Sequence, residues 1–203
     1  MREHTDTSRD PGPASAHRLK PLPALGGDQP RVEDISGLRI AEVMDSALAS
    51  LSCRRGRNAE FAAFAERVFG FALPGPARAV MGTPYGAVWT GPEQWFIEAP
   101  FASHEDIARL LKGEFRDLAS ITEQTDGWVR FDVTGKGALD VFERLCPLDV
   151  QAMEDNAASR TLIEHLGCIV ICRKAAVEFS VLGPRSAAAS LHHALIAAAR
   201  SAL

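Results

Sequence analysis

Three carboxylates in the middle of the sequence could support acid–base chemistry. Glu123, Asp126 and Asp132 lie close together along the chain, and two such groups facing one pocket can act as proton donor and acceptor. Asp126, however, precedes Gly127 in a dipeptide that favours a turn. Asp132 alternates with apolar neighbours and is expected to face solvent. A turn and an exposed strand face therefore explain these residues more simply than catalysis does.

The arginine-rich segment 53–57, with the sequence CRRGR, could bind a charged ligand. Arg54, Arg55 and Arg57 flank a glycine, and three guanidinium groups in one loop could bind a carboxylate or an acidic patch on a partner. A solvated loop without a ligand explains the same pattern equally well, so both alternatives stay open.

The four cysteines are Cys53, Cys146, Cys168 and Cys172. Cys168 and Cys172 lie in a run rich in Ile and Val that predicts a strand, where four residues span roughly 13 Å. That separation exceeds the reach of a disulfide. His165 would lie on the opposite face of the same strand, so it cannot join both thiols around one metal ion. We therefore predict buried, reduced thiols and no metal site.

The other histidines do not form a recognisable site. His192 and His193 are neighbours on a predicted helix, about 100° apart around its axis, and cannot chelate one ion together. His4 and His17 lie in the N-terminal segment, and His104 is expected in the exposed first turn of a helix. We predict surface or capping roles for all of them.

Residues 135–140, with the sequence GKGALD, lie between a predicted strand and a predicted helix and mimic the start of a dinucleotide-binding loop. The pattern fails at its third glycine position, where Asp140 would place a carboxylate near the pyrophosphate. A tight strand-to-helix turn is the simpler interpretation. The sequence also has no phosphate-binding lysine loop, nucleophile elbow or paired-histidine helix motif.

The composition is typical of a globular protein. The 203 residues are 46% apolar, which is enough for a core in one large domain or two small ones. The net charge of -4 and the absence of Lys or Arg runs predict no nucleic-acid partner and no anionic-lipid partner. No segment has the apolar length of a secretory signal or a membrane span, so we expect a cytoplasmic protein without a membrane partner.

Composition divides the chain into an N-terminal arm and a folded domain. Residues 1–30 carry several prolines among small polar residues and almost no large apolar side chains, which predicts a flexible arm. The arm is either a plain tail or a segment that orders against a partner. Residues 31–203 are expected to form one α+β domain, which could divide into two sub-lobes at about 45–117 and 118–203.

Hydrophobic spacing predicts a repeated order of strand pair and helix. The spacing of four apolar residues predicts a helix that follows Asn58 as its candidate cap and stops at Gly70: Phe61, Phe64, Val68 and Phe69. Strand pairs are expected at 85–90 with 94–99, at 118–124 with 128–134, and at 161–171 with 176–182. Further helices are expected after Ser103, in a capping box with Asp106, over 137–146, and after Ser186. The weaker pattern of residues 35–52 fits either a strand or a short helix.

These elements together predict the fold class. Short turns between paired strands require antiparallel pairing, because a parallel pair needs a long crossover connection. We therefore expect an α+β fold in two layers, with antiparallel sheets built from hairpins and helices packed on one face.

With these segments in place, the sequence from about residue 48 onward resembles the gamma subunit of heterotetrameric sarcosine oxidase. The resemblance rests on five motifs: RRG at 54–56, GFALP at 70–74, WTGPEQW at 89–95, QTDGW at 124–128 and GPRS at 183–186. Each motif is short, but their order and spacing make the combination specific. The N-terminal arm lies outside the resemblance.

That subunit is similar in turn to the folate-binding aminomethyltransferases of glycine cleavage. When the sequences are aligned at Gly135, the catalytic Asp-x-Ser motif of that family falls on residues 124–126, and Gln124 stands in the place of the acid. A glutamine cannot carry the negative charge that stabilises a cationic methylene intermediate. The acidic pair of the family is likewise replaced by residues 171–173, with the sequence ICR. The resemblance therefore implies no catalytic, cofactor-binding or metal-binding residues on this chain.

What the resemblance implies is a non-catalytic structural subunit of an oxidase complex. The complex would demethylate sarcosine to glycine with O2 and tetrahydrofolate, giving methylenetetrahydrofolate and hydrogen peroxide. Alpha, beta and delta subunits would be its partners, and they would hold FAD, FMN, NAD and the tetrahydrofolate.

Two other functions remain open. One is a stand-alone folate-binding protein of one-carbon transfer, which would have a pocket faced by a carboxylate such as Glu123 or Asp126. The other is a redox or metal protein built on the cysteines.

Overall fold

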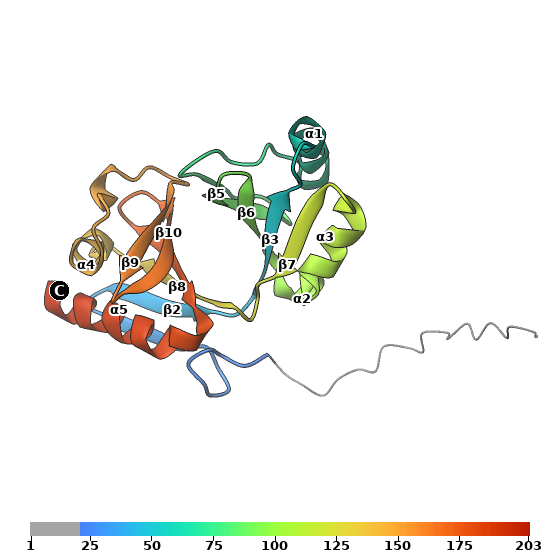
Figure 1. Ribbon diagram of the computed structural model, residues 1–203. Coiled ribbons are helices and arrows are strands. Elements are labelled where there is room, and N and C mark those ends of the chain that lie inside the picture. Colours follow the sequence, from blue (N-terminus) through green and yellow to red (C-terminus); the bar gives the residue numbers. More distant parts are fainter. Residues whose placement is uncertain (1–20) are drawn as a thin grey trace, which may run out of the picture.

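The chain folds into two antiparallel β-sheets with helices on their outer faces (Figure 1). The structure is a computed structural model that describes residues 21–203. The six-stranded sheet has the order β1–β2–β8–β11–β10–β9, with β1 (Val32–Ile35), β2 (Leu38–Val43), β8 (Trp128–Thr134), β9 (Ala158–Ile163), β10 (Leu166–Lys174) and β11 (Glu178–Pro184). The five-stranded sheet has the order β4–β5–β6–β3–β7, with β3 (Ser46–Cys53), β4 (Ala79–Val80), β5 (Gly86–Gly91), β6 (Gln94–Pro100) and β7 (Ala119–Glu123). The predicted α+β class is confirmed.

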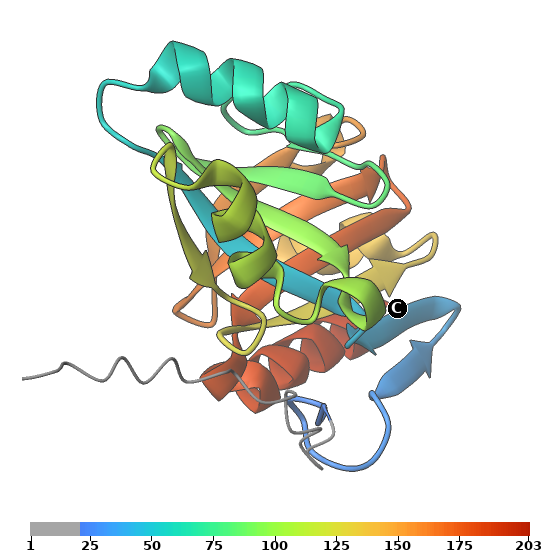
Figure 2. The ribbon, with the colours of Figure 1, turned by 90° about the vertical axis from the view of Figure 1, so that its right-hand side faces the viewer.

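Each sheet carries its own helices on one face. The helices are α1 (Asn58–Phe69), α2 (Phe101–His104), α3 (Ile107–Phe115), α4 (Ala138–Leu145) and α5 (Ala188–Ala202), with short 3-10 turns η1 (Val150–Ala152) and η2 (Arg185–Ala187). One apolar core joins α4 and α5 to the six-stranded sheet. A second joins α1 and α3 to the five-stranded sheet, and Figure 2 shows these two helices lying across that sheet.

The two sheets pack against each other through a third core, so the expected two layers describe only half of the molecule. Leu48, Val88 and Phe96 of the five-stranded sheet meet Ile169 and Ile171 of the six-stranded sheet in this core. The observed order is therefore helices, sheet, sheet and helices. Each sheet has one apolar face toward its helices and a second, partly polar face toward the other sheet.

One predicted strand pair is wrong. The segments 118–124 and 128–134 do not pair with each other, because β7 pairs with β3 in the five-stranded sheet while β8 lies between β2 and β11 in the six-stranded sheet. The turn itself is present, since the Gly127 amide donates to the Gln124 carbonyl oxygen at 2.9 Å. It carries the chain from one sheet to the other instead of closing a hairpin.

The predicted strand 161–171 is also wrong, because it is a hairpin. β9 and β10 pair on either side of Glu164 and His165, which both have positive φ angles of 48° and 67°. His165 is therefore an exposed turn residue and not a strand residue. The expected pairing with the following strand is confirmed, since β10 also pairs with β11.

Two predicted helix caps are wrong, and one of them is replaced by another contact. Ser103 lies within α2, and the residue that precedes α3 is Asp106, whose side chain makes no capping hydrogen bond. The Glu123 carboxylate accepts from the Ala108 amide at 3.2 Å in its place. Ser186 lies in η2, and α5 begins after Ala187 without a side-chain cap.

The predicted N-terminal arm falls largely outside the described residues, as do His4 and His17. Its last part, residues 21–30, is attached to the fold through the buried carboxylate of Glu42, which is only 4% exposed. That carboxylate accepts hydrogen bonds from the backbone amides of Ala24, Leu25 and Arg31. Residues 21–30 therefore lie against β2. In the part of the chain from residue 21 onward, no helix has the length and apolar character needed to cross a membrane.

Candidate functional site

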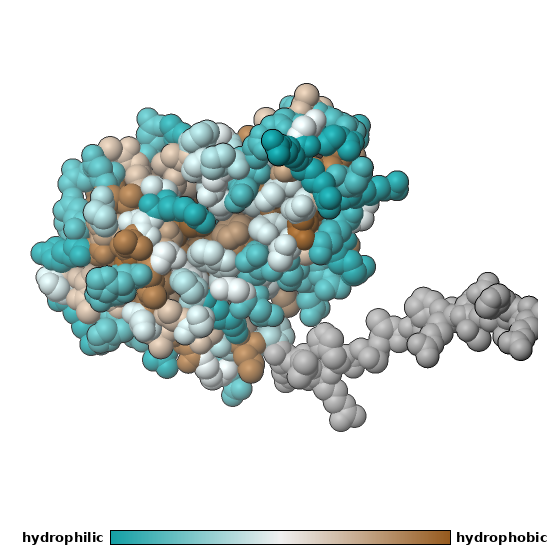
Figure 3. Space-filling model, in the orientation of Figure 1, coloured by the Kyte–Doolittle hydropathy of each residue, from teal (hydrophilic) through white to brown (hydrophobic). Residues whose placement is uncertain are grey.

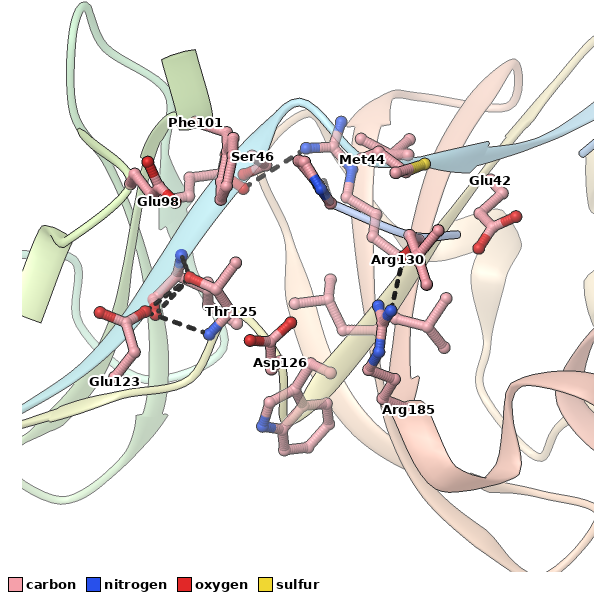
Figure 4. A pocket seen from close by; sticks show the side chains of 18 of the residues that line it. Glu42, Met44, Ser46, Glu98, Phe101, Glu123, Thr125, Asp126, Arg130 and Arg185 are labelled. Carbon is pink, nitrogen blue, oxygen red and sulfur yellow. Dashed lines mark hydrogen bonds and ion pairs between the residues drawn. The ribbon is translucent and has the colours of Figure 1, made fainter. Parts of the chain in front are cut away.

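A cavity of about 520 Å³ opens beside the connection between the two sheets (Figure 4). Residues 124–127 form this connection between β7 and β8. The walls come from both sheets, from the start of α3 and from residues 21 and 22. Phe101 and Trp128 supply aromatic surface, and charged side chains supply most of the polar surface.

Glu123 lines the cavity, but its carboxylate is committed to local structure. One oxygen accepts from the Ala108 amide at the start of α3, and the other accepts from the hydroxyl of Thr125 at 2.5 Å and from its amide at 3.3 Å. Thr125 in turn accepts from the Leu48 amide at 2.9 Å. Glu123 therefore joins a helix start, a turn and a strand, which is a structural role.

Gln124, at the position where the resemblance places the catalytic acid, also has a structural contact. Its side-chain oxygen accepts from the indole nitrogen of Trp128 at 3.2 Å. The side chain is neutral and this hydrogen bond occupies its acceptor. It supplies no charge to the cavity.

Asp126 is the lining carboxylate that stays available. Among residues 21–203, its side chain makes no hydrogen bond and no ion pair, and the residue is exposed. The stick view shows it pointing into the cavity next to Thr125 (Figure 4). Asp126 therefore presents to the cavity a carboxylate that has no partner among residues 21–203.

Arg185 stands on the other side of the cavity. Its guanidinium donates to the backbone oxygen of Leu22 at 2.5 Å and makes no ion pair with any carboxylate of residues 21–203. Its backbone amide donates to the Gly127 carbonyl oxygen at 3.0 Å, which attaches η2 to the connection between the sheets.

A network of charged side chains lies between the two sheets at one end of the cavity. Arg173 of β10 donates to both oxygens of Glu98 of β6, at 2.8 and 3.2 Å, and its Nε donates to Ser180 at 2.9 Å. Ser180 donates to Asp132 at 2.6 Å, and Asp132 also accepts two hydrogen bonds of 2.8 Å from Arg130. Two carboxylates and two guanidinium groups balance, so the network is neutral.

The predicted exposure of Asp132 is therefore wrong. The face of β8 that carries Arg130 and Asp132 is covered by the five-stranded sheet, and their side chains are only 22% and 21% exposed. The opposite face, with Val129, Phe131 and Val133, is buried against α5 and α4 as the alternation predicted.

Arg173 and its neighbours control the ionisation of Glu98. Burial raises the pKa of this carboxyl, but the hydrogen bond from Arg173 and the positive charges of Arg173 and Arg130 lower it further than burial raises it. The resulting pKa lies below the ordinary value, so Glu98 is ionised at neutral pH. The ion pair between Glu98 and Arg173 therefore links the two sheets.

With this geometry established, comparison with solved structures identifies the fold. The chain is similar to a chain of the heterotetrameric sarcosine oxidase from Corynebacterium sp. U-96, solved in complex with pyrrole 2-carboxylate. The TM-score is 0.70 at 20% identity, over 83% of this chain and 88% of that chain. The fold is of the sarcosine oxidase and aminomethyltransferase type. No protein-family model and no curated protein matches the sequence.

A second similar structure is the glycine cleavage system aminomethyltransferase T from Bartonella henselae. It has a TM-score of 0.57 at 10% identity and covers 76% of this chain. The chain spans only 44% of that aminomethyltransferase. Both identities are low, so these comparisons establish a shared fold.

The thiols lie apart from the cavity of Figure 4. Cys146, Cys168 and Cys172 are buried and Cys53 is half-buried, and all four are free thiols. Burial raises the pKa of Cys168 and of Cys172 to about 11, so both stay protonated at neutral pH. Residues 21–203 contain no group of three or more His, Cys, Asp or Glu side chains that could hold a metal ion.

The arginines of segment 53–57 do not converge on one point. Arg54 donates to the Ala119 carbonyl oxygen at 3.4 Å, whereas Arg57 pairs with Glu60 at 2.8 Å and with Asp117 at 3.2 Å. Of the two alternatives for this segment, the solvated loop fits these contacts better.

The remaining histidines are also apart from the cavity. His104 contacts the ring of Tyr85, and His192 lies beside Phe131. Burial lowers the pKa of His192, so this imidazole is neutral at pH 7.

Sequence reasoning missed the residues that define the cavity and its network. Glu98 lies in an apolar strand, Glu42 in a weakly patterned segment, and Arg185 in a GPRS motif that gave no chemical signal. Their roles depend on contacts between residues far apart in sequence, such as Arg173 with Glu98. A charge inside an otherwise apolar strand is the one local signal that could have singled out Glu98.

Proposed function

We propose that this chain is a non-catalytic, gamma-type subunit of a heterotetrameric sarcosine oxidase. The observation that carries the proposal is the nearly end-to-end match to one chain of such an enzyme, over 83% and 88% of the two lengths. A chain of the same fold and extent fits the same place in an assembly. In this proposal the alpha, beta and delta partners hold FAD, FMN, NAD and tetrahydrofolate, and the complex works in the cytoplasm.

The contacts of Glu123 and Gln124 support a role without catalysis. Glu123 is hydrogen-bonded to Ala108 and Thr125, and Gln124 is neutral and bonded to Trp128. Acid–base catalysis needs a group that can gain or lose a proton where the substrate binds. Neither side chain is available for that task.

Copurification from the native host tests this function. The tagged chain should recover flavin-bearing subunits in fixed ratio, and the complex should produce peroxide when sarcosine is added while the free chain produces none. Recovery of the chain without flavoprotein partners, under conditions that keep sarcosine-dependent peroxide production in the remaining lysate, would contradict the proposal.

Asp126 favours a second candidate, a stand-alone folate-binding protein of one-carbon transfer. Its carboxylate is free and points into a cavity large enough for an organic ligand. Calorimetric titration of the purified chain with tetrahydrofolate separates the two candidates. Binding to the isolated chain that disappears in Asp126→Asn supports the second candidate, and absence of binding leaves the subunit role as the better explanation.

The surface beside β9 is the best candidate for contact with a partner subunit. Leu162 is 60% exposed, and a depression of about 610 Å³ beside it is lined by Pro147, Leu148 and Ile169. Figure 3 shows apolar residues gathered on this side of the molecule, where β9 and α4 lie. Arg160 is the one charged residue that lines the depression and has no ion pair within residues 21–203, so an apolar partner segment with an acidic residue fits this surface.

The change Leu162→Asp should weaken assembly without unfolding the chain. It places a charge in the apolar part of the proposed contact, and we expect recovery of the partner subunits to fall at least roughly tenfold. Leu110→Asp, at an exposed apolar position on α3, is the matched control and should assemble normally. Equal recovery with both variants would show that β9 is not the docking surface, whereas the copurification itself tests the function.

A further inference from the structure

We propose that the cavity between the sheets binds a small zwitterion of the amino acid class, with its ammonium group at Asp126 and its carboxylate at Arg185. This inference goes beyond the structural role proposed above, because that role requires no ligand on this chain. It also assigns the cavity a ligand that differs in charge from a folate.

The first argument is which of the lining side chains already have partners within the protein. Most of them are satisfied within the protein: Glu42 by three backbone amides, Glu98 and Arg130 by the network, and Glu123 by the start of α3. Asp106 pairs with Arg109 at 2.9 Å. These side chains therefore already have partners within the protein, although Glu42 and Glu123 keep their negative charges.

Two side chains of opposite charge remain whose hydrogen-bonding groups are largely unused within residues 21–203. Asp126 has no partner among residues 21–203, and Arg185 has only the neutral backbone oxygen of Leu22. A guanidinium carries five N–H donors, so Arg185 can bind a carboxylate and keep its bond to Leu22. The two side chains do not pair with each other, which leaves both charges open to a ligand.

The second argument is their placement. Figure 4 shows Asp126 next to Thr125 and Arg185 across the cavity from it, on the side where Arg130 and Glu42 lie. A molecule with a positive end and a negative end is favoured at both sides. A dianion has no cation to meet at Asp126 and a dication has no anion to meet at Arg185, whereas a zwitterion can satisfy both side chains.

The third argument is the apolar surface between the charges. The aromatic side chains of Phe101 and Trp128 line the cavity together with Leu48 and Leu182. A cavity of about 520 Å³ has room for an amino acid with an apolar side chain, and Trp128 can also attract an ammonium group through its ring.

A set of three related ligands tests the inference on the full chain. L-Leucine carries both charges, isopentylamine lacks the carboxylate, and 4-methylpentanoate lacks the ammonium group. In NMR titrations we expect leucine to shift the Trp128 indole signal and to bind roughly tenfold more tightly than either analogue, because each loses one charge-assisted contact.

Variants locate the binding site. Asp126→Asn and Arg185→Gln should each weaken leucine binding roughly tenfold, while Asp140→Asn and Arg200→Gln, two exposed charges elsewhere, should leave it unchanged. Asp126→Asn removes no side-chain hydrogen bond or ion pair within residues 21–203. Its effect on leucine affinity can therefore be interpreted even if Arg185→Gln loosens residues 21 and 22.

Several outcomes would overturn the inference. Absence of leucine binding, equal affinity for leucine and the single-charge analogues, or equal effects of the site and control variants would each do so. Tetrahydrofolate binding at Asp126 without leucine binding would assign the cavity to the second candidate function. None of these results bears on copurification with an oxidase, so the two proposals fail independently.

Discussion

Replacing Arg173 by methionine should lower the free energy of unfolding by about 3–5 kcal/mol. Arg173 and Glu98 are only 9% and 13% exposed and form two hydrogen bonds across the sheets. Removal of the guanidinium leaves Glu98 buried with Arg130 as its remaining cation, at 3.5 Å. Urea unfolding at pH 7, followed by tryptophan fluorescence, measures the loss.

Two further variants separate the buried charge from ordinary packing. Arg78→Met breaks the exposed pair with Glu154, whose side chains are 51% and 76% exposed, and should cost no more than about 1 kcal/mol. The double change Glu98→Gln with Arg173→Met should be less destabilising than Arg173→Met alone, since it also removes the unpaired carboxylate. Similar losses for Arg173→Met and Arg78→Met would contradict a structural role for the network.

Acidification gives an independent check on the same pair. The pKa of Glu98 in the native protein is lowered, so its ion pair stabilises the fold above the ordinary Glu pKa of about 4.3 and loses this effect as the pH falls through the native value. In Arg173→Met the main cause of the lowering is gone and burial dominates. Protonation of Glu98 then removes the unpaired buried charge from the variant. The difference in the free energy of unfolding between the variant and the wild type should therefore become smaller between pH 7 and pH 4.

Individual helices and strands could be predicted from the sequence where the spacing of apolar residues depends on that helix or strand alone. The aromatic stripe of Phe61 and Phe69 lies on a helix, as predicted, which ends before Gly70, although Asn58 is its first helical residue and not its cap. The alternation in β8 placed Val129, Phe131 and Val133 in the core. These patterns report which face of an element is apolar, and local spacing is sufficient for that.

The sequence could not predict what covers the second face. Polar residues at alternate positions of β8 predicted that this face of the strand is exposed to solvent. Arg130 and Asp132 are instead covered by the other sheet, and their burial is tolerated because Arg130 pairs with Asp132 and with Glu98. The dipeptide of Asp126 and Gly127 predicted a hairpin. A turn dipeptide determines the local bend of the chain, but it does not determine which strand the next segment pairs with. The turn at Glu164 and His165 has neither Gly, Pro, Asn nor Asp, so a hairpin was read as one strand.

The candidate site was only partly predictable for the same reason. Glu123, Asp126 and Asp132 are candidates because they lie close together in sequence, and the structure places Glu123 and Asp126 on the cavity and Asp132 in the network between the sheets. Their different roles could not be read from the sequence. Glu123 is engaged by Ala108 and Thr125, and Asp126 is left free, because the start of α3 lies next to β7 and the turn projects away from it.

Truncation of Phe115 to alanine should also be strongly destabilising, by about 3–5 kcal/mol. The side chain is fully buried at the end of α3. Its ring lies 5.8 Å from that of Phe61, 5.1 Å from Phe64 and 5.5 Å from Phe69, measured between centroids. It therefore joins α3 to three positions of α1 over the five-stranded sheet, and its loss leaves a cavity that two helices and a sheet would have to close.

The same helix supplies the control for this prediction. Leu110→Ala removes a side chain that is 39% exposed, and should change stability by no more than about 0.5 kcal/mol. Phe115→Leu keeps most of the apolar volume and should fall between the two. A Phe115→Ala protein as stable as Leu110→Ala would mean that α1 and α3 are not joined through this aromatic group. Trp95 stacks on Phe61, with 5.7 Å between ring centroids, so tryptophan fluorescence includes a signal from a residue next to this aromatic group during urea unfolding.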